Sequence, residues 1–103
     1  MAKSLGAWFR QARNERKLPI RAIAAAAEMD QALLSKVELG QRLPTEEQAG
    51  KIARHLGIDE TKVIGRLFAE RFIRDHKDRP AAAQEAISIL GEQAPVYASA
   101  RKR

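Results

Sequence analysis

The sequence has no cysteine, so disulfide bonds and cysteine-ligated zinc sites are excluded. Aromatic residues make up only 5% of the chain, and no run of residues is apolar enough to span a membrane. No secretory signal is visible, and we expect no membrane partner. Alternating runs of Val, Ile and Thr are missing, whereas alanine is abundant within a hydrophobic content of 45%. This composition favours an all-α protein.

A catalytic constellation is also missing. The two histidines, His55 and His76, are isolated and lack the HxxxH or HExxH spacing of metal sites. No glycine-rich phosphate-binding loop occurs, and the acidic residues are scattered along expected helices, where solvation or i,i+4 ion pairs explain them. We therefore expect no enzyme activity, no metal and no cofactor.

The charge of the chain is unbalanced, with a formal net charge of +6 at neutral pH. Such an excess favours a polyanionic partner such as nucleic acid. Arg101, Lys102 and Arg103 supply three of these charges, so the rest of the chain is only mildly basic. Charge alone is therefore weak support for a nucleic-acid partner. With 103 residues, the chain has room for one domain with a modest core.

The middle of the chain predicts two short helices, over residues 19–28 and 31–39. Pro19 suits a first helical turn, where its missing N–H costs no hydrogen bond. Asp30 is a good N-cap for the second helix, and Gly40 fits the position that ends it. Two short helices joined by a tight turn, the second with an exposed polar face, form a helix-turn-helix.

A spaced set of residues accompanies this motif. Its members are Ile23, Ala24, Met29, Leu34, Ser35, Lys36, Val37, Glu38, Gly40 and Pro44, with Leu5, Gly6 and Arg13 upstream. The set resembles the phage-repressor and Cro class of helix-turn-helix regulators, also called the xenobiotic-response-element type. Two positions depart from the family pattern, because Pro19-Ile20 replaces a common Ser-Gln and Glu28 replaces the glycine of the turn.

The resemblance implies a five-helix lambda-repressor-like DNA-binding domain over residues 1–77, in a cytoplasmic bacterial protein that associates with the nucleoid when it is bound to DNA. After this domain we predict a C-terminal packing or dimerisation helix over residues 78–93, starting near Ala81 and ended by Gly91. Residues 94–103 are small and basic, and we expect them to form a mobile tail.

Three further helices are predicted within the domain from periodicity and capping residues. The first runs from Ser4 to Arg16. The second begins at a capping box formed by Thr45 and Gln48 and is stopped by Gly57. The third begins at Asp59 and continues to about Lys77. Together with the helix-turn-helix, they complete the five-helix domain.

The exposed side of the helix over residues 31–39 is the candidate DNA-binding surface, because a recognition helix presents its N-terminal side chains to base edges. The predicted DNA-binding residues are Gln31, Ala32, Leu33, Ser35, Lys36, Arg21, Gln41 and Arg42. Gln31 suits adenine and Lys36 suits guanine, whereas Arg42 in the following loop suits a phosphate or a narrow minor groove. The alternative is an ordinary polar helix surface, and for Leu33 partial core packing is an equally good explanation.

Two charged residues occupy positions that should be partly buried. Arg13 lies four residues after Phe9, and Glu38 lies four residues after Leu34 on the inner face of its helix. A buried charge needs a partner. The family resemblance pairs the corresponding positions, so we expect a structural ion pair between Arg13 and Glu38. The alternative is that both side chains extend into solvent.

The helix that starts at Asp59 carries an apolar band wider than one small core needs. The predicted dimer-interface residues on it and on the last helix are Ile64, Phe68, Phe72, Ile87, Ile89 and Leu90. Cover by the last helix of the same chain is the simpler explanation. We predict a homodimer because two recognition helices related by a two-fold axis contact two DNA half-sites.

The predicted function is sequence-specific binding to double-stranded DNA as a transcription regulator. The resemblance favours a dimeric repressor or autoregulator of a palindromic operator. One alternative is an antitoxin-type interaction module, which binds a partner toxin and also DNA. Another is an architectural or RNA-associated helix-turn-helix protein with weak sequence selectivity.

Overall fold

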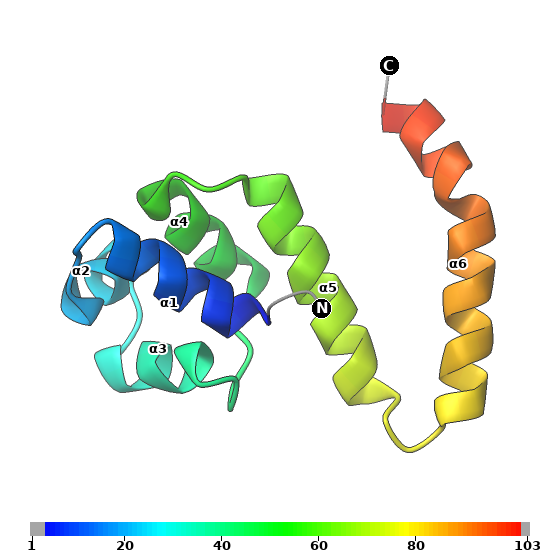
Figure 1. The fold of residues 1–103 in the computed structure, drawn as a ribbon, viewed down its shortest axis with the longest axis horizontal. Helices are drawn as coiled ribbons and strands as arrows, with labels where there is room; N and C mark the ends of the chain where they lie inside the picture. Colours follow the sequence, from blue (N-terminus) through cyan, green and yellow to red (C-terminus); the bar gives the residue numbers. More distant parts are fainter. Residues whose placement is uncertain (1–3, 102–103) are drawn as a thin grey trace. The chain divides into compact units, whose positions relative to one another are not determined.

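The computed structural model describes residues 4–101, and within that range the chain forms helices and no strand (Figure 1). The predicted all-α class is therefore confirmed. The helices are α1 (Leu5–Glu15), α2 (Ile20–Ala26), α3 (Gln31–Glu38), α4 (Glu46–Leu56), α5 (Glu60–Asp75) and α6 (Pro80–Arg101). The chain divides into two compact units, and the boundary falls within α5, between Arg71 and Phe72.

All five helices of the first unit contribute to its core. The largest fully buried side chains are Leu5, Phe9, Ile23, Leu34, Val37, Ile52, Leu56, Val63 and Leu67. Within a helix they recur three or four residues apart, which places them on one side of that helix. α1 and α2 each pack against both α3 and α4, so α3 is supported from beneath by two helices.

The predicted helix starts are confirmed by their caps. The Ser4 hydroxyl accepts a hydrogen bond from the Ala7 N–H at 3.2 Å, and the Asp30 carboxylate accepts one from the Ala32 N–H at 3.2 Å. Thr45 and Gln48 form the predicted capping box at the start of α4. These bonds satisfy N–H groups that the first turn of a helix leaves without partners.

Gly6 lies where α1 crosses the end of α3. A β-carbon at Gly6 would overlap the Val37 carbonyl oxygen and would lie 2.9 Å from the Glu38 carbonyl oxygen. Both obstacles are backbone atoms, which cannot move aside as the end of a flexible side chain can. Glycine is therefore required here for the close contact that fixes α3 against α1.

Glu28 occupies the turn between α2 and α3 with a φ of +54°, in the left-handed region. A residue with a β-carbon is disfavoured there by about 1–2 kcal/mol, whereas glycine is not. The Glu28 carboxylate lies 3.2 Å from the Lys51 ammonium of α4, and this hydrogen bond is the largest cause of the raised pKa of Lys51. The turn thus has the conformation that the family's usual glycine favours.

α6 differs from its prediction, because it continues past Gly91 and through Pro95 to Arg101. The prediction that Gly91 ends this helix is wrong, and residues 94–101, which were predicted as a tail, are part of the helix. A single glycine costs a helix only about 1 kcal/mol. Pro95 removes the backbone bond to the carbonyl of Gly91, yet the flanking residues retain their helical conformation. Residues 102 and 103 lie outside the described range.

The surroundings of α6 also distinguish it from the other helices. None of its described side chains is buried, and Ala83 and Ala86 are the most covered of them.

None of the helices within residues 4–101 combines the length and the apolar character that crossing a membrane requires.

Candidate nucleic-acid interface

α3 presents two different sides. Leu34 and Val37 are buried in the core, whereas Gln31, Ala32 and Lys36 are exposed. The exposed residues start at the first position of the helix, where a recognition helix approaches base edges most closely. The structure therefore brings these three predicted contact residues together on one open surface.

The remaining predicted contact residues of α3 are less accessible. Leu33 and Ser35 are half-buried, so part of each side chain supports the fold rather than facing solvent. Arg21 on α2 is exposed, as are Gln41 and Arg42 in the loop after α3. Gly40, with a φ of +79°, ends α3 in the left-handed conformation and begins this loop.

The predicted pair of Arg13 and Glu38 is present beneath α3. The Arg13 Nε donates to Glu38 Oε2 at 2.8 Å, and its Nη2 donates to Oε1 at 2.9 Å. Only 15% of the arginine side chain and 6% of the glutamate side chain are exposed. The hydrogen bond to Glu38 is the main reason that the pKa of Arg13 is raised further above its already high ordinary value.

This pair also fixes the entry to the helix-turn-helix. The Arg13 Nη1 donates to the Leu18 carbonyl oxygen at 2.9 Å, in the connection between α1 and α2. One guanidinium group thus links α1, the start of the motif and the end of α3. A bidentate bond between a planar fork and a carboxylate restricts both distance and angle, so the pair sets the position of α3 rather than contacting DNA.

Two residues near α3 were missed in the sequence analysis as contact candidates. Arg10 of α1 and Leu39 at the end of α3 line a hollow of about 260 Å³, together with Ile20, Ser35 and Glu38. Leu39 is 60% exposed, so its side chain is accessible to a ligand. Helical spacing alone places Leu39 on the outer side of α3. Arg10 belongs to α1, and only the folded structure brings it next to Leu39.

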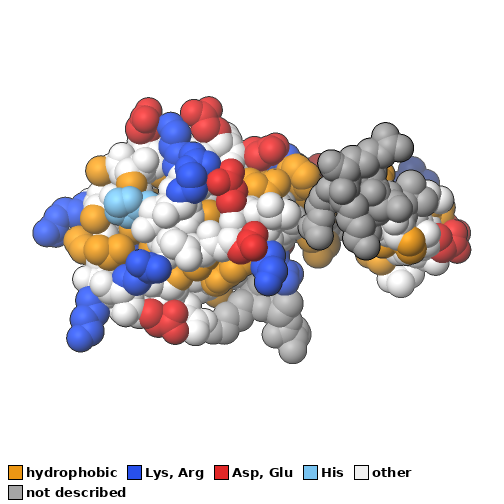
Figure 2. Space-filling model, turned by 90° about the horizontal axis from the view of Figure 1, so that it is seen from above, with side chains coloured by type: hydrophobic (Ala, Val, Ile, Leu, Met, Phe, Trp, Pro, Cys, Tyr) orange, Lys and Arg blue, Asp and Glu red, His pale blue; other side chains and the backbone are white. Residues whose placement is uncertain are grey.

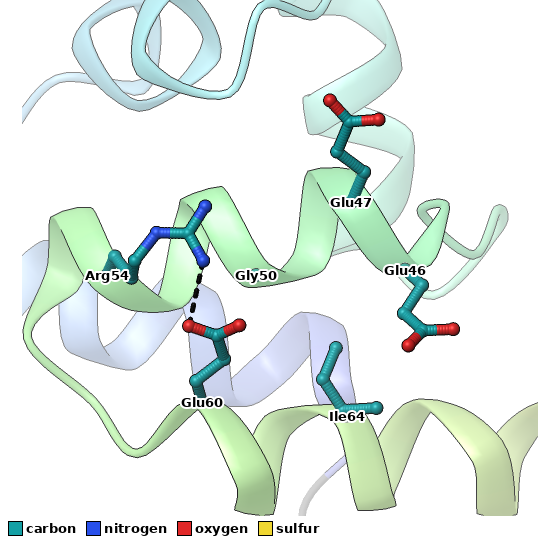
Figure 3. A pocket seen from close by; sticks show the side chains of 6 residues that line it. All are labelled: Glu46, Glu47, Gly50, Arg54, Glu60 and Ile64. Carbon is teal, nitrogen blue, oxygen red and sulfur yellow. Dashed lines mark hydrogen bonds and ion pairs between the residues drawn. The ribbon is translucent and has the colours of Figure 1, made fainter.

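A second hollow lies between α4 and the start of α5, and its chemistry differs (Figure 3). It has a volume of about 430 Å³ and is lined by Glu46, Glu47, Gly50, Arg54, Glu60 and Ile64. Arg54 is neutralised by Glu60, with a distance of 2.8 Å between their charged atoms. The Lys51 ammonium lies 3.2 Å from the Glu47 carboxylate, so most of the charge here is paired and the hollow offers no excess of cations for a phosphate.

Charges of both signs are interspersed on the side of the first unit that Figure 2 shows. On that side of the unit, contact with a polyanion would depend on a local arrangement of cations. Within the described part of the chain, no group of His, Asp and Glu side chains is placed to hold a metal ion.

The predicted dimer-interface residues fall in both units. In the first unit, Ile64 is half-buried against the core, whereas Phe68 is 50% exposed with the Arg71 guanidinium 5.9 Å from its ring centre. In the second unit, Phe72 is half-buried beside the ring of His76. The three aliphatic residues of α6 are each about half exposed: Ile87, Ile89 and Leu90.

Comparisons with known proteins agree with this geometry. Residues 4–63 match a family model described as a helix-turn-helix domain, which covers α1 to α4 and the first turn of α5. The chain is also similar to the crystal structure of the clp gene regulator ClgR from Corynebacterium glutamicum, with a TM-score of 0.55 and 22% sequence identity. That likeness covers 88% of this chain and 90% of the other, and it shows a shared fold. No curated protein matches the sequence significantly.

Proposed function

The chain belongs to the helix-turn-helix domain family, and from this premise we propose that it is a sequence-specific transcription regulator that contacts base edges through α3. The observation that carries the proposal is the open outer side of α3, with Gln31, Ala32 and Lys36 exposed above a fully buried underside. We further propose that the first unit is a DNA-binding domain of the lambda-repressor-like type.

Each exposed residue of α3 has a base for which its chemistry is suited. Gln31 can donate to and accept from adenine, Lys36 can donate to guanine, and Ala32 can contact a thymine methyl group. Arg21, Gln41 and Arg42 flank α3 and suit phosphate contacts, which position a protein without selecting a sequence. Arg10 and Leu39 extend this surface along the side of α3.

We propose that the active species is a homodimer that represses its target or its own gene from a palindromic operator. One recognition helix contacts few base pairs, and a two-fold axis doubles the contacted sequence. The exposed aromatic and aliphatic residues of α5 and α6 supply apolar area that such a dimer would cover, since large uncovered apolar surfaces are unusual in monomers.

The test is selection of bound duplexes from a random DNA pool, followed by sequencing. We expect an inverted repeat whose half-sites lie about one helical turn apart. The variant Gln31→Ala serves as the matched comparison, and its selected sequences should lose preference at particular base pairs only. Selection of no sequence above background by the native protein would contradict the proposal.

The dimer has its own test, in Phe72→Asp. A carboxylate at this half-buried position would be costly to cover, so we expect monomers by light scattering and loss of tight operator binding. Helix content measured by circular dichroism should remain near that of the native protein. A native protein that stays monomeric at high concentration and binds a single asymmetric site at full affinity would rule out the dimer.

An antitoxin-type interaction module is the second candidate function. The exposed apolar side chains of α6 favour it, because a foreign protein could cover them as well as a second copy could. Such a module also binds DNA, so DNA binding does not separate the two. Purification from the native host separates them: a second small protein in equal amount supports the module, and a pure homodimer supports the regulator.

A further inference from the structure

The second unit contains an apolar hollow in the corner between the end of α5 and the first turns of α6. It has a volume of about 320 Å³ and is lined by Phe72, His76, Arg79, Ala82, Ala83 and Ala86. The rings of Phe72 and His76 form one wall, with their centres 4.6 Å apart. The opposite wall is made of alanines, whose short side chains leave space that a larger side chain could fill.

One stripe of α6 changes from small to large side chains along the helix. Ala83 and Ala86, in its first turns, are followed at helical spacing by Leu90 and Tyr97. Leu90 is 51% exposed and Tyr97 is 68% exposed, whereas the two alanines are half-buried. The beginning of the stripe therefore offers a hollow, and its end offers large side chains that the described residues leave at least half exposed.

We propose that this stripe pairs with the same stripe of a second copy of the chain, with the two α6 helices antiparallel. A register that places Leu90 of one copy opposite Ala86 of the other also places Tyr97 opposite Arg79, at the mouth of the hollow. Each copy then fills the hollow of the other. Tyr97 would lie where its ring can contact both the Arg79 guanidinium and the Phe72 and His76 rings.

Self-complementarity is the reason for choosing a second copy in this orientation. A two-fold interface requires that a surface fit itself, and a stripe that is small at one end and large at the other fits itself only when reversed. A parallel pair would set alanine against alanine and leave both hollows empty. An empty apolar hollow loses dispersion contacts that an inserted leucine or tyrosine restores.

The charges of α6 permit this pairing. Between Pro80 and Arg101 the charged residues are Glu85 and Glu92 alone, seven residues apart. Helical spacing places both on the side of α6 away from Leu90 and Tyr97. The two acidic side chains of each copy would therefore remain in water, and the charged group that the pair covers would be Arg79, beneath the Tyr97 ring.

The break in the backbone ladder at Pro95 is also consistent with this pairing. The proline ring crowds the carbonyl of Gly91, and this crowding bends a helix away from the proline. Pro95 lies on the side of α6 away from Leu90 and Tyr97, so the bend curves the stripe toward a partner. Figure 1 shows α6 bending over its last turns.

This inference rests on the proposed homodimer, and cysteine cross-linking distinguishes its failure from that of the dimer. The chain has no cysteine, so any disulfide that forms must join the introduced cysteines. Ala83→Cys and Gln93→Cys chains with different tags are co-expressed and oxidised mildly. The antiparallel register places these two positions opposite each other, whereas two copies of Ala83→Cys would be about 15 Å apart along the helices. We expect disulfides between the two variants and none within either variant.

The other possible outcomes contradict either the antiparallel register or the dimer itself. Disulfides within Ala83→Cys alone indicate a parallel pair, and absence of all disulfides in a protein that light scattering shows to be dimeric indicates a different interface. Both overturn this inference and leave the dimer intact. A native protein that is monomeric at high concentration overturns the proposed dimer and this inference together, as would be expected if α6 packs on its own chain.

A size exchange provides a second measurement. Leu90→Ala and Ala86→Leu should each weaken dimerisation by roughly tenfold or more, because one removes the inserted side chain and the other fills its space. The double variant restores a large residue against a small one and should recover most of the native affinity. Ser88→Ala, on the outward side, is the control. A double variant weaker than either single variant would contradict the register.

Discussion

α3 and α6 are both exposed helices, but they are exposed in opposite ways. α3 has eight residues, with one side buried in the core and the other side polar and open. α6 has 22 residues, none of its described side chains is buried, and its exposed side chains are largely apolar. α3 is therefore a polar surface held on a packed core, whereas α6 exposes apolar side chains that are usually covered in a folded protein.

This difference indicates what each helix binds. The polar outer side of α3 suits the donors and acceptors of base edges, and its underside holds it in place before DNA is present. α6 offers no cation between Arg79 and Arg101 for phosphate, which agrees with the proposal that it pairs with a protein surface. The proposals therefore assign DNA and protein binding to two separate regions of the chain.

The support beneath α3 can be broken most severely at Gly6. In Gly6→Ala the new β-carbon overlaps the Val37 carbonyl oxygen, so α1 and α3 must separate. We expect a loss of more than about 4 kcal/mol in the free energy of unfolding, enough to unfold a marginal domain. Denaturant titration followed by circular dichroism measures this loss.

Gly65→Ala is the matched control for that change. A β-carbon at Gly65 meets nothing within 4 Å, and the residue lies inside α5. Alanine there should raise stability by about 0.5–1 kcal/mol, because glycine is the poorer helix former. Equal effects of the two substitutions would show that α1 and α3 are not in close backbone contact.

The ion pair beneath α3 is the next most sensitive point. Glu38→Ala leaves the Arg13 guanidinium without its carboxylate in a largely buried site, and we expect a loss of about 3 kcal/mol in stability. The variant Arg13→Met with Glu38→Leu removes both charges and should cost less than the two single changes added together. Additive changes below 1 kcal/mol in the double-mutant cycle would show that both charges are effectively solvated.

The features of this fold that the sequence predicted are those set by residues close together in the chain. Ser4, Asp30 and Thr45 mark helix starts through bonds to their own first turns, so sequence alone located them. The end of α6 could not be predicted in this way. Gly91 is an adequate stop signal locally, and its effect is outweighed by helix-forming neighbours on both sides.

The proposed DNA-binding surface was also predictable only in part from the sequence. Gln31 and Lys36 follow from helical spacing, because they lie on the element whose buried side is identifiable. The proximity of Arg10 to Leu39 depends on how α1 crosses α3, and no spacing along the chain encodes that crossing. The pairing of Arg13 with Glu38 was predicted only because a family resemblance connected the two distant positions.

The outer side of α3 can be tested without disturbing its support. Lys36→Ala removes an exposed side chain, so stability should remain unchanged while preference at one base pair falls by about 1–3 kcal/mol. Arg42→Ala, in the loop, should weaken binding to all sequences alike and reduce the salt dependence by about one counterion. Binding titrations at several salt concentrations measure both. A Lys36→Ala protein with altered salt dependence and intact base preferences would place Lys36 at a phosphate.

The smallest expected effect lies in the turn that joins α2 to α3, and it tests whether support and recognition are separable. Glu28→Gly relieves the left-handed strain at a φ of +54°, at the cost of an exposed ion pair with Lys51 and of a more flexible unfolded chain. We expect a net gain of about 0.5 kcal/mol in stability, because the strain of about 1–2 kcal/mol exceeds these losses. Glu28→Ala keeps the strain and loses the ion pair, so it should be slightly less stable than the native protein. Base preferences should be identical in all three proteins, and a change in them would show that the turn also sets the orientation of α3 on DNA.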